Sequence, residues 1–495
     1  MTVPLDSAAQ LSQLLTSGEA TAVEVAQEAL RRIEASEPAI NAFNHVAGEA
    51  VIRQAEELDK RRSAGQPLGR LAGIPVAVKD VLCTTEMPTT CASRMLRDYM
   101  SPYDATVIAK LRAADALLIG KTNMDEFAMG ASTENSACGP TYNPWDRTRT
   151  PGGSSGGAAA AVAACDVPLS LGSDTGGSIR QPAAFCGITG MKPTYGRVSR
   201  YGLVAFASSL DQIGPMSWDA ADNALLMSVI AGHDPRDSTS LPAAVDDYSL
   251  AVDQADVRGM RIGVIRDQLE NPGLDDDARQ AVQAAIDVFR DAGAELIDVR
   301  FQYSRYWVPT YYIIAPCEAS SNLSRYDGAH YGFRSLGTRE VVQKFGPLMA
   351  MYCHSRDDGF GPEVKRRIML GTYALSEGYA AKYYTKALSV RRLIRQDYDD
   401  AFAKVDILLG PVTPTPAFRL GEKMDDPLQM YLCDLFTVGA NLAGLPALAV
   451  PAGKTADALP VGIQLQAAPL HEPALYRAAG AFQQATEHHT RRPPQ

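Results

Sequence analysis

Apolar residues recur every four positions near the start of this chain, which is the spacing of an amphipathic helix. Thr21 and Glu24 form a capping-box pattern just before this stretch, and Pro38 follows it. The pattern predicts a helix that begins after Thr21 and ends at Pro38. We expect residues 1–60 as a whole to form an N-terminal helical segment.

Farther along, short continuous apolar runs alternate with helical patterns. Runs of this kind, bounded by glycine or charged residues, are typical of buried strands. The predicted strands are 74–78, 116–119, 167–171, 261–265 and 405–409. The predicted helices are 106–112, an alanine-rich helix after Gly157, and an amphipathic helix from about 275 to 293. Strands that alternate with helices indicate an α/β fold in which helices cover both faces of a sheet.

The length of 495 residues would allow about three domains. However, no Pro/Ser-rich linker longer than a few residues divides the chain, and no fixed-period repeat is visible. We therefore expect a single large domain that spans residues 1–495.

Composition narrows the classes of function. Hydrophobic residues make up 46% of the chain and charged residues 21%, which excludes a disordered or fibrous protein. Lys and Arg number 47 against 57 Asp and Glu, a net charge of −10. A surface with this charge repels phosphate backbones, so we do not expect the chain to bind nucleic acid by itself.

The eight cysteines form no C-x-x-C pair, and several lie in small apolar contexts. This pattern is typical of reduced cytosolic thiols and indicates neither a zinc site nor a disulfide framework. No signal peptide and no apolar run of roughly 20 residues is visible, so we expect a cytoplasmic protein without a membrane span.

Two familiar catalytic patterns are incomplete. Gly120-Lys121-Thr122 follows a predicted strand, as in a phosphate-binding loop, but that loop needs a glycine where this chain has Asp115. No histidine lies between residues 46 and 232, so the sequence does not indicate a Ser-His-Asp triad.

The densest chemical signal is a pair of Gly/Ser loops. Residues 152–157 are GGSSGG and residues 172–178 are GSDTGGS, with one helix and one strand between them. A flexible linker is the simpler interpretation, but a linker would not run directly into a buried alanine-rich helix. The two loops can bring two serines together at one sheet edge, and their glycines can turn successive N–H groups toward a developing oxyanion.

A serine nucleophile needs a base, and Lys79 at the end of a predicted buried strand is the available candidate. A lysine pKa is ordinarily near 10.4, but burial can lower it by about 3–5 units. A neutral Lys79 could then take a proton from one serine while that serine takes a proton from the other. From the residues alone, the alternative is a structural lysine in a salt bridge with Asp80 or Asp174.

Residues 151–193, together with Gly-Ile-Pro-Val-Ala-Val-Lys-Asp at 73–80, resemble the amidase signature family. In that family the nucleophile is the serine of a Thr-Gly-Gly-Ser loop, which is Ser178 here. The bridging serine, often preceded by a cis peptide, matches Ser154, and the general base matches Lys79. The resemblance therefore implies a Lys-Ser-Ser relay.

The same resemblance places the oxyanion-binding backbone at Thr175, Gly176 and Gly177. It implies the amidase-signature fold, which has a mixed β-sheet core covered by helices on both faces. Within the single domain it implies a catalytic core at 70–220 and a substrate-pocket and partner-facing region at 300–440.

Further segments are similar to one branch of that family, the A subunits of tRNA-dependent amidotransferases. These segments are 123–130, 195–215, 318–328, 363–371 and 425–438. The resemblance implies a glutaminase that passes ammonia to a partner, within a heterotrimer with subunits B and C. ATP, Mg²⁺ and the misacylated Glu-tRNA(Gln) or Asp-tRNA(Asn) would bind the partner, and this chain would hold no cofactor or metal.

Glutamine is a zwitterion, so its recognition requires a cation for the carboxylate and an anion for the ammonium group. By resemblance these are Arg367 and Asp434, and Tyr311 supplies a wall or a hydrogen bond. The adjacent Arg366 and Tyr312 remain alternatives, since neighbouring residues face different ways. A charged pair buried without ligand is costly, so we expect the empty pocket to close or to fill with water.

Two other functions remain open. A stand-alone amidase would share Lys79, Ser154 and Ser178 but would act on a different small amide, and a non-catalytic scaffold would form no acyl-enzyme. Cys138 has no functional explanation, and we expect it to be a buried structural thiol.

Overall fold

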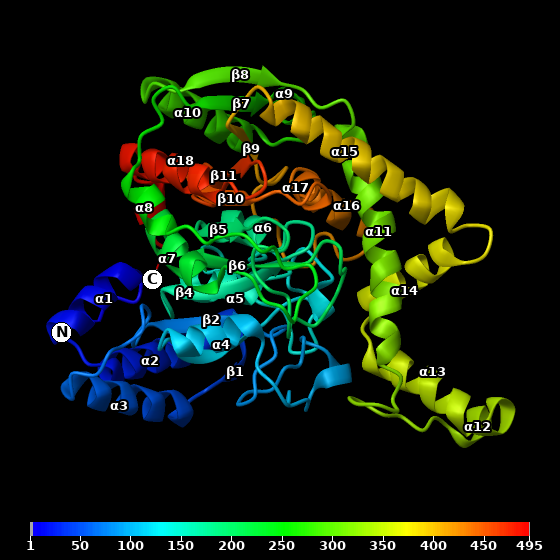
Figure 1. Ribbon diagram of the computed structural model, residues 1–495. Helices are drawn as coiled ribbons and strands as arrows, with labels where there is room; N and C mark the ends of the chain where they lie inside the picture. Colours follow the sequence, from blue (N-terminus) through cyan, green and yellow to red (C-terminus); the bar gives the residue numbers. More distant parts are fainter. Residues whose placement is uncertain (1–2, 495) are drawn as a thin grey trace.

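The computed structural model describes residues 3–494, in which eleven strands form one mixed sheet (Figure 1). Strand β2 is parallel to β3 and β4, and β7 is parallel to β8 and β9, whereas the other neighbouring pairs are antiparallel. The order across the sheet is β1 (Phe43–Val46), β3 (Leu117–Thr122), β2 (Pro75–Lys79), β4 (Leu169–Asp174), β6 (Gln212–Ser217), β5 (Thr189–Lys192), β10 (Ala447–Lys454), β11 (Pro460–Ala467), β9 (Ile407–Pro411), β7 (Arg261–Ile265) and β8 (Glu295–Val299).

Eighteen α-helices surround this sheet in the described chain. They are α1 (Ala8–Ser17), α2 (Ala22–Ile40), α3 (Glu49–Ser63), α4 (Thr106–Ala113), α5 (Gly156–Ala163), α6 (Arg180–Cys186), α7 (Ala220–Ile230), α8 (Tyr248–Asp253), α9 (Arg266–Leu269), α10 (Asp276–Asp291), α11 (Trp307–Asn322), α12 (Arg339–Phe345), α13 (Pro347–Gly359), α14 (Pro362–Leu375), α15 (Lys386–Phe402), α16 (Pro427–Tyr431), α17 (Val438–Leu442) and α18 (Glu472–Ala485).

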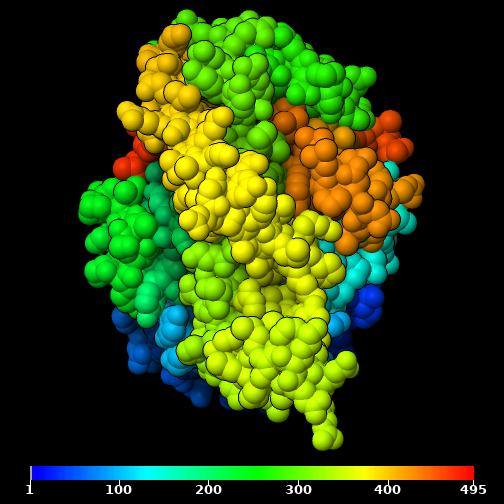
Figure 2. Space-filling view, turned by 90° about the vertical axis from the view of Figure 1, so that its right-hand side faces the viewer, coloured from blue at the N-terminus to red at the C-terminus, as the bar shows by residue number. Residues whose placement is uncertain are grey.

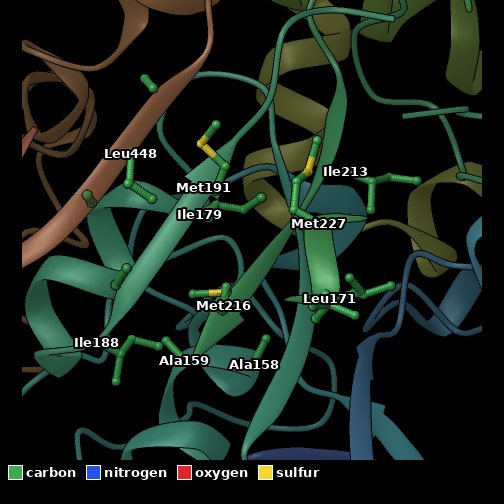
Figure 3. Close-up of a cluster of buried hydrophobic side chains, with 14 of the residues drawn as sticks. Ala158, Ala159, Leu171, Ile179, Ile188, Met191, Ile213, Met216, Met227 and Leu448 are labelled. Carbon is green, nitrogen blue, oxygen red and sulfur yellow. The ribbon is translucent and has the colours of Figure 1, made fainter. Parts of the chain in front are cut away.

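The central strands are covered on both faces. Every residue of β2, β3, β4, β6 and β9 is buried, so side chains that point to opposite faces are both shielded from water. Figure 3 shows part of this core, in which alanines of α5 gather with side chains of four strands: Ala158, Ala159, Leu171, Met191, Met216 and Leu448. The small residues of α5 allow its backbone to approach closely, because a Cβ on Gly157 would lie 2.4 Å from the carbonyl oxygen of Asn123.

The topology brings the ends of two strands together. Strands β2 and β4 are parallel, with Val78 opposite Leu171, so their carboxyl ends lie at the same edge of the sheet. Lys79 is the last residue of β2, and the second Gly/Ser loop follows Asp174, the last residue of β4.

A helical arm, α11 to α15, stands along one side of the sheet (Figure 1). In the space-filling view this segment, yellow-green to yellow, lies across the face turned to the viewer (Figure 2). Helix α14 packs along α11, and the two backbones approach closely at Gly371, where a Cβ would lie 1.9 Å from the carbonyl oxygen of Pro316. The arm carries residues of the candidate site on its inner side.

The structure confirms the α/β fold with a mixed sheet, and each predicted strand and helix has a counterpart within a few residues. Two details of the N-terminal prediction are wrong. Helix α2 continues through Pro38 to Ile40, because a proline in the last turn removes only one helical hydrogen bond. The helix ends instead at Asn41, which has a left-handed backbone conformation. Residues 1–60 are also not wholly helical, since β1 adds an edge strand there. No helix in residues 3–494 combines the length and apolar character needed to cross a bilayer.

Candidate active site

Lys79 contacts three serine hydroxyls at the shared edge of β2 and β4. Its Nζ lies 2.8 Å from Oγ of Ser154 and 2.8 Å from Oγ of Ser155. Oγ of Ser173 lies 3.0 Å from the same nitrogen. All of these side chains are buried, so the amine is held by neutral groups in a site closed to water.

The loop that carries Ser154 is fixed by Asp125. The peptide bond between Gly153 and Ser154 is cis, as the resemblance implies for the bridging serine. The Asp125 carboxylate accepts the N–H groups of Ser132 and Thr133, and the Asp125 N–H donates to the carbonyl of Ser154. A Cβ on Gly153 would lie 2.1 Å from Oδ2 of Asp125, so only glycine permits this approach.

The surroundings of Lys79 favour a neutral amine. Burial lowers the pKa of Lys79 to about 7, and the more distant carboxylates of Asp125 and Asp174 only partly oppose that effect. The alternative of a structural salt bridge is wrong, because both candidate partners are engaged elsewhere. Asp80 pairs with Lys121 at 3.2 Å, and Asp174 pairs with Arg180 at 3.0 Å.

Ser178 lies beside this group, at the start of the turn that enters α6. Its carbonyl oxygen accepts the N–H of Ser155 at 3.2 Å, which ties the two Gly/Ser loops together. Within residues 3–494 its hydroxyl makes no hydrogen bond, and the residue is 7% exposed. The structure thus joins Lys79 to Ser154 directly and places Ser178 next to them without a hydroxyl–hydroxyl contact.

The backbone between Asp174 and Ser178 forms a constrained turn. Gly177 has a φ of +151°, which side-chain-bearing residues rarely adopt. Thr175 donates its hydroxyl to Asp211, and Thr437 donates its hydroxyl to the carbonyl of Gly176 at 2.6 Å. The N–H groups of Gly176 and Gly177 donate to no other group in the described chain, which leaves them available to an oxyanion.

A buried cluster of one arginine and several aromatic side chains adjoins this turn. Arg367 of α14 is 3% exposed, and its guanidinium lies 5.4–5.5 Å from the ring centroids of Phe206, Tyr312 and Tyr431. Its Nε donates to Glu363 at 2.8 Å, while its two terminal nitrogens make no hydrogen bond within residues 3–494. Burial opposes the charge, but Glu363 and the neighbouring tyrosines hold the pKa of Arg367 well above its usual range.

Asp434, in the segment after α16, belongs to the same buried cluster. It accepts the hydroxyl of Tyr312 at 2.9 Å, and its Oδ1 lies 3.3 Å from the position that a Cβ on Gly177 would take. Burial raises the pKa of Asp434 to about 7, although Tyr312 and Arg367 favour the ionised form. Tyr311 packs on the turn as well, since a Cβ on Gly176 would lie 2.6 Å from its Cζ.

Comparisons with known proteins show the family to which this chain belongs. The model of the family described as Amidase matches residues 24–476. The chain belongs to the amidase family. It is 64% identical over 490 residues to the A subunit of glutamyl-tRNA(Gln) amidotransferase from Rhodopirellula baltica, covering 99% of this chain and 98% of the relative.

Two solved amidase-family structures are also similar. The crystal structure of the A subunit of glutamyl-tRNA(Gln) amidotransferase from Thermotoga maritima has a TM-score of 0.77 and 40% identity, with 94% of this chain and 92% of that one covered. The native peptide amidase of Stenotrophomonas maltophilia has a TM-score of 0.81 and 31% identity, covering 99% and 98%. The fold is therefore common to amidotransferase subunits and to amidases of other kinds.

The structure distinguishes between the adjacent residues that the sequence left open. Arg366 lies on the outer side of α14, with its side chain 42% exposed, and pairs with the second oxygen of Glu363. Arg367 is the residue that lies inside the buried cluster. Tyr311 and Tyr312 both belong to it, with rings at 4.9 Å, but only Tyr312 bonds Asp434.

Sequence reasoning missed three side chains of this amidase site. Ser155 and Ser173 both bond the Lys79 amine. Each lies in one of the two Gly/Ser loops that the sequence analysis identified, but neither was named there as a site residue. Glu363 pairs with Arg367 at 2.8 Å and so balances its charge, while the expectation that the empty pocket closes or fills with water stays a prediction. The helical spacing of four residues between Glu363 and Arg367 is the signal that could have revealed this pair.

Cys138 is not a buried thiol, contrary to expectation. It is exposed in a surface turn, which the hydrogen bond from the Gly139 N–H to the Ser136 carbonyl closes. All eight cysteines of the amidase are unpaired, as predicted. Within residues 3–494 no group of three or more His, Cys, Asp or Glu side chains is placed to hold a metal ion.

Proposed function

We propose that this amidase is the glutaminase subunit of an aminoacyl-tRNA amidotransferase. The observation that carries the proposal is a buried group beside a Lys-Ser contact in which Tyr312 adjoins both Arg367 and the carboxylate of Asp434. Glu363 pairs with Arg367 from the other side, and Asp434 is the carboxylate left for a ligand cation. A zwitterionic amide needs both a cation and an anion, whereas a neutral amide does not. The 64% identity to the A subunit of a glutamyl-tRNA(Gln) amidotransferase supports the same function.

In the first step Ser178 attacks the side-chain amide of glutamine. Ser154 takes the proton of Ser178 Oγ while it passes its own proton to neutral Lys79, 2.8 Å away. The carbonyl oxygen becomes an oxyanion, which the backbone N–H groups of Thr175, Gly176 and Gly177 stabilise.

In the second step the tetrahedral intermediate collapses. Ser154 delivers a proton to the leaving nitrogen and Lys79 restores it, so ammonia departs and a γ-glutamyl ester remains on Ser178. Water then attacks the ester, its proton follows the same path back, and glutamate and free Ser178 result. Ser155 and Ser173 keep the Lys79 amine aimed at Ser154 throughout.

Glutamine would be oriented by its two charges. The free terminal nitrogens of Arg367 would receive the α-carboxylate, and Asp434 would receive the α-ammonium group through its unshared Oδ1. Tyr311, packed on Gly176, would form the wall between this pocket and the reacting amide. The side-chain amide is thereby directed toward Ser178.

Ammonia would pass to a partner in a heterotrimer with subunits B and C. The partner would bind the misacylated Glu-tRNA(Gln) or Asp-tRNA(Asn) and would hold ATP and Mg²⁺, in keeping with the net charge of −10 on this chain. A cytoplasmic location and the absence of a cofactor in this chain remain predictions.

The test is glutamine hydrolysis by the purified chain, alone and with its B and C subunits, ATP and misacylated tRNA. We expect ammonia release to rise in the complex, to match the amidated tRNA formed, and to disappear in Ser178→Ala. Glutamine hydrolysis that survives Ser178→Ala would refute the assigned nucleophile.

A stand-alone amidase is the second candidate, favoured by the similarity to a peptide amidase at 31% identity. It would use Lys79, Ser154 and Ser178 without needing charge recognition. Fast hydrolysis of uncharged amides that is insensitive to Asp434→Asn and to partner subunits would support it.

A further inference from the structure

Glu126 is a buried carboxylate that the proposed mechanism does not use. It directly follows Asp125 and begins a short 3₁₀ helix, η2 (Glu126–Ala128). The residue is 5% exposed, and its side chain accepts a hydrogen bond from Ser93 Oγ. The other carboxylate oxygen accepts the N–H of Gly361 at 2.7 Å. A buried carboxylate with two specific donors is held in one place.

Gly361 is the N-cap of α14, the helix that carries Arg367. A Cβ at residue 361 would lie 2.4 Å from Oε2 of Glu126, so the contact depends on glycine. Its φ of −74° is ordinary, which means that close approach rather than backbone conformation requires glycine here. Glu126 thus accepts a hydrogen bond from the backbone N–H of the residue that caps α14.

The other end of α14 is fixed separately. Gly371 approaches the Pro316 carbonyl of α11 so closely that any side chain there would clash. Arg367 lies between these two contacts, six residues after Gly361 and four before Gly371. Without the contact at Gly361, the N-terminal half of α14 could pivot about the contact with α11 and displace Arg367.

Glu126 also adjoins the support of the catalytic loop. Asp125 holds the turn around Ser154 through the N–H groups of Ser132 and Thr133. Phe127, on the other side of Glu126, packs edge-on against Phe360, with ring centroids 5.6 Å apart. Three consecutive residues therefore connect the catalytic loop with the start of α14.

We propose that Glu126 is a positioning residue that sets the distance between Arg367 and the catalytic serines by fixing the N-terminal end of α14. The inference rests on the proposed function, since it assumes that Arg367 binds the carboxylate of glutamine. Its role is in substrate affinity. The catalytic loop keeps its own support from Asp125, so the reactivity of Ser178 does not depend on Glu126.

The experiment measures glutamine affinity and serine reactivity separately in the full-length chain. Glutamine binding is measured by calorimetry in a Ser178→Ala background, where no turnover occurs. Reactivity is measured with Ser178 intact, as the rate of inactivation by phenylmethanesulfonyl fluoride, a small neutral reagent that does not need Arg367. The variants are Glu126→Ala, Glu126→Gln, Gly361→Ala and Arg367→Lys, and Glu57→Ala on exposed α3 is the matched control.

We expect Glu126→Ala to raise the Kd for glutamine about tenfold and to change the inactivation rate by less than about twofold. Gly361→Ala should have the same effect from the opposite side of the contact. Glu126→Gln should restore affinity, because its amide oxygen still accepts the Gly361 N–H. Glu57→Ala should leave both readouts unchanged.

The inference is wrong if Glu126→Ala binds glutamine like the parent while Arg367→Lys binds it weakly. It is also wrong if Glu126→Ala or Gly361→Ala lowers affinity and serine reactivity together, since that would indicate a general structural role. If Arg367→Lys itself leaves the Kd unchanged, the glutamine pocket of the proposed function is what fails.

Discussion

Replacement of Lys79 by methionine tests the central electrostatic claim. Lys79 is wholly buried among three serine hydroxyls, and burial lowers its pKa from an ordinary value near 10.5 to about 7. A pKa lowered by this much corresponds to a loss of about 5 kcal/mol in the free energy of unfolding at pH values below 7, where the folded protein must hold a buried charge. Methionine has a similar length and carries no charge.

The sign of the pH dependence follows from the two pKa values. Between about pH 7 and pH 10.5 the unfolded chain binds a proton at Lys79 and the folded chain does not, so the wild-type free energy of unfolding rises with pH. In this range the free energy of unfolding rises by about 1.4 kcal/mol per pH unit. Below pH 7 both states bind the proton, so the free energy no longer changes with pH and the folded protein bears the full cost of the buried charge. Relative to Lys79→Met, the wild type should therefore gain about 2–3 kcal/mol between roughly pH 7.5 and pH 9.5.

The assay is urea unfolding of wild type and Lys79→Met at these two pH values, because the difference between the proteins cancels the other titrating groups. Lys60→Met, at an exposed position of α3, is the matched control. In parallel, kcat/KM for glutamine should rise with pH through an inflection near pH 7 in the wild type, as Lys79 loses its proton. Lys79→Met should have no measurable glutaminase activity.

A stability difference that stays constant from pH 7.5 to pH 9.5 would refute the reasoning. It would mean that Lys79 titrates alike in the folded and unfolded chain, so that the folded protein holds it as a cation at neutral pH. A charged Lys79 could not accept the proton of Ser154, and the relay would need another base.

Three further predictions concern the pocket, the turn and the surface. Asp434→Asn should weaken glutamine binding by about 10- to 100-fold in calorimetry. In the wild type, affinity should fall as pH drops below 7, because burial raises the pKa of Asp434 to about 7 and the protonated acid cannot pair with ammonium; equal affinity at pH 6 and pH 8 would contradict this. Gly176→Ala should lower kcat by about 10²–10³-fold with the fold retained by circular dichroism, because its Cβ would lie 2.6 Å from Tyr311 and displace the oxyanion-binding turn; near-normal kcat would rule out that role. Cys138→Ser should leave glutaminase activity and stability unchanged within about 0.5 kcal/mol, and a maleimide should label wild-type Cys138 without loss of activity, since the residue is exposed.

The sequence predicted the elements of the catalytic core well because their signals are local. A continuous apolar run gives the buried strand before Lys79, and alanine-rich composition gives α5. The N-terminal misses arise where local signals mislead. Pro38 is a strong helix breaker in sequence, but within the last turn of α2 its cost is small.

The pocket was less predictable because its contacts join distant segments. Arg367, Asp434 and Tyr311 could be named only through family resemblance, and the residues alone did not separate Arg367 from Arg366. The fold separates them, since α14 turns one arginine toward the pocket and leaves the other largely in solvent. Glu126 gave no chemical signal in sequence, because its partner Gly361 lies 235 positions away.

By itself, the sequence determined which atoms could react: serines on glycine-rich turns, and a lysine at the end of a buried strand. Its periodicity also determined the alternation of strands and helices, because side-chain burial follows the local repeat. Only the tertiary structure decided the charge state that burial favours at Lys79 and the partner of each carboxylate. A pKa depends on desolvation and on charges brought from elsewhere in the chain, and these exist only once the parallel ends of β2 and β4 meet and the helical arm packs beside them.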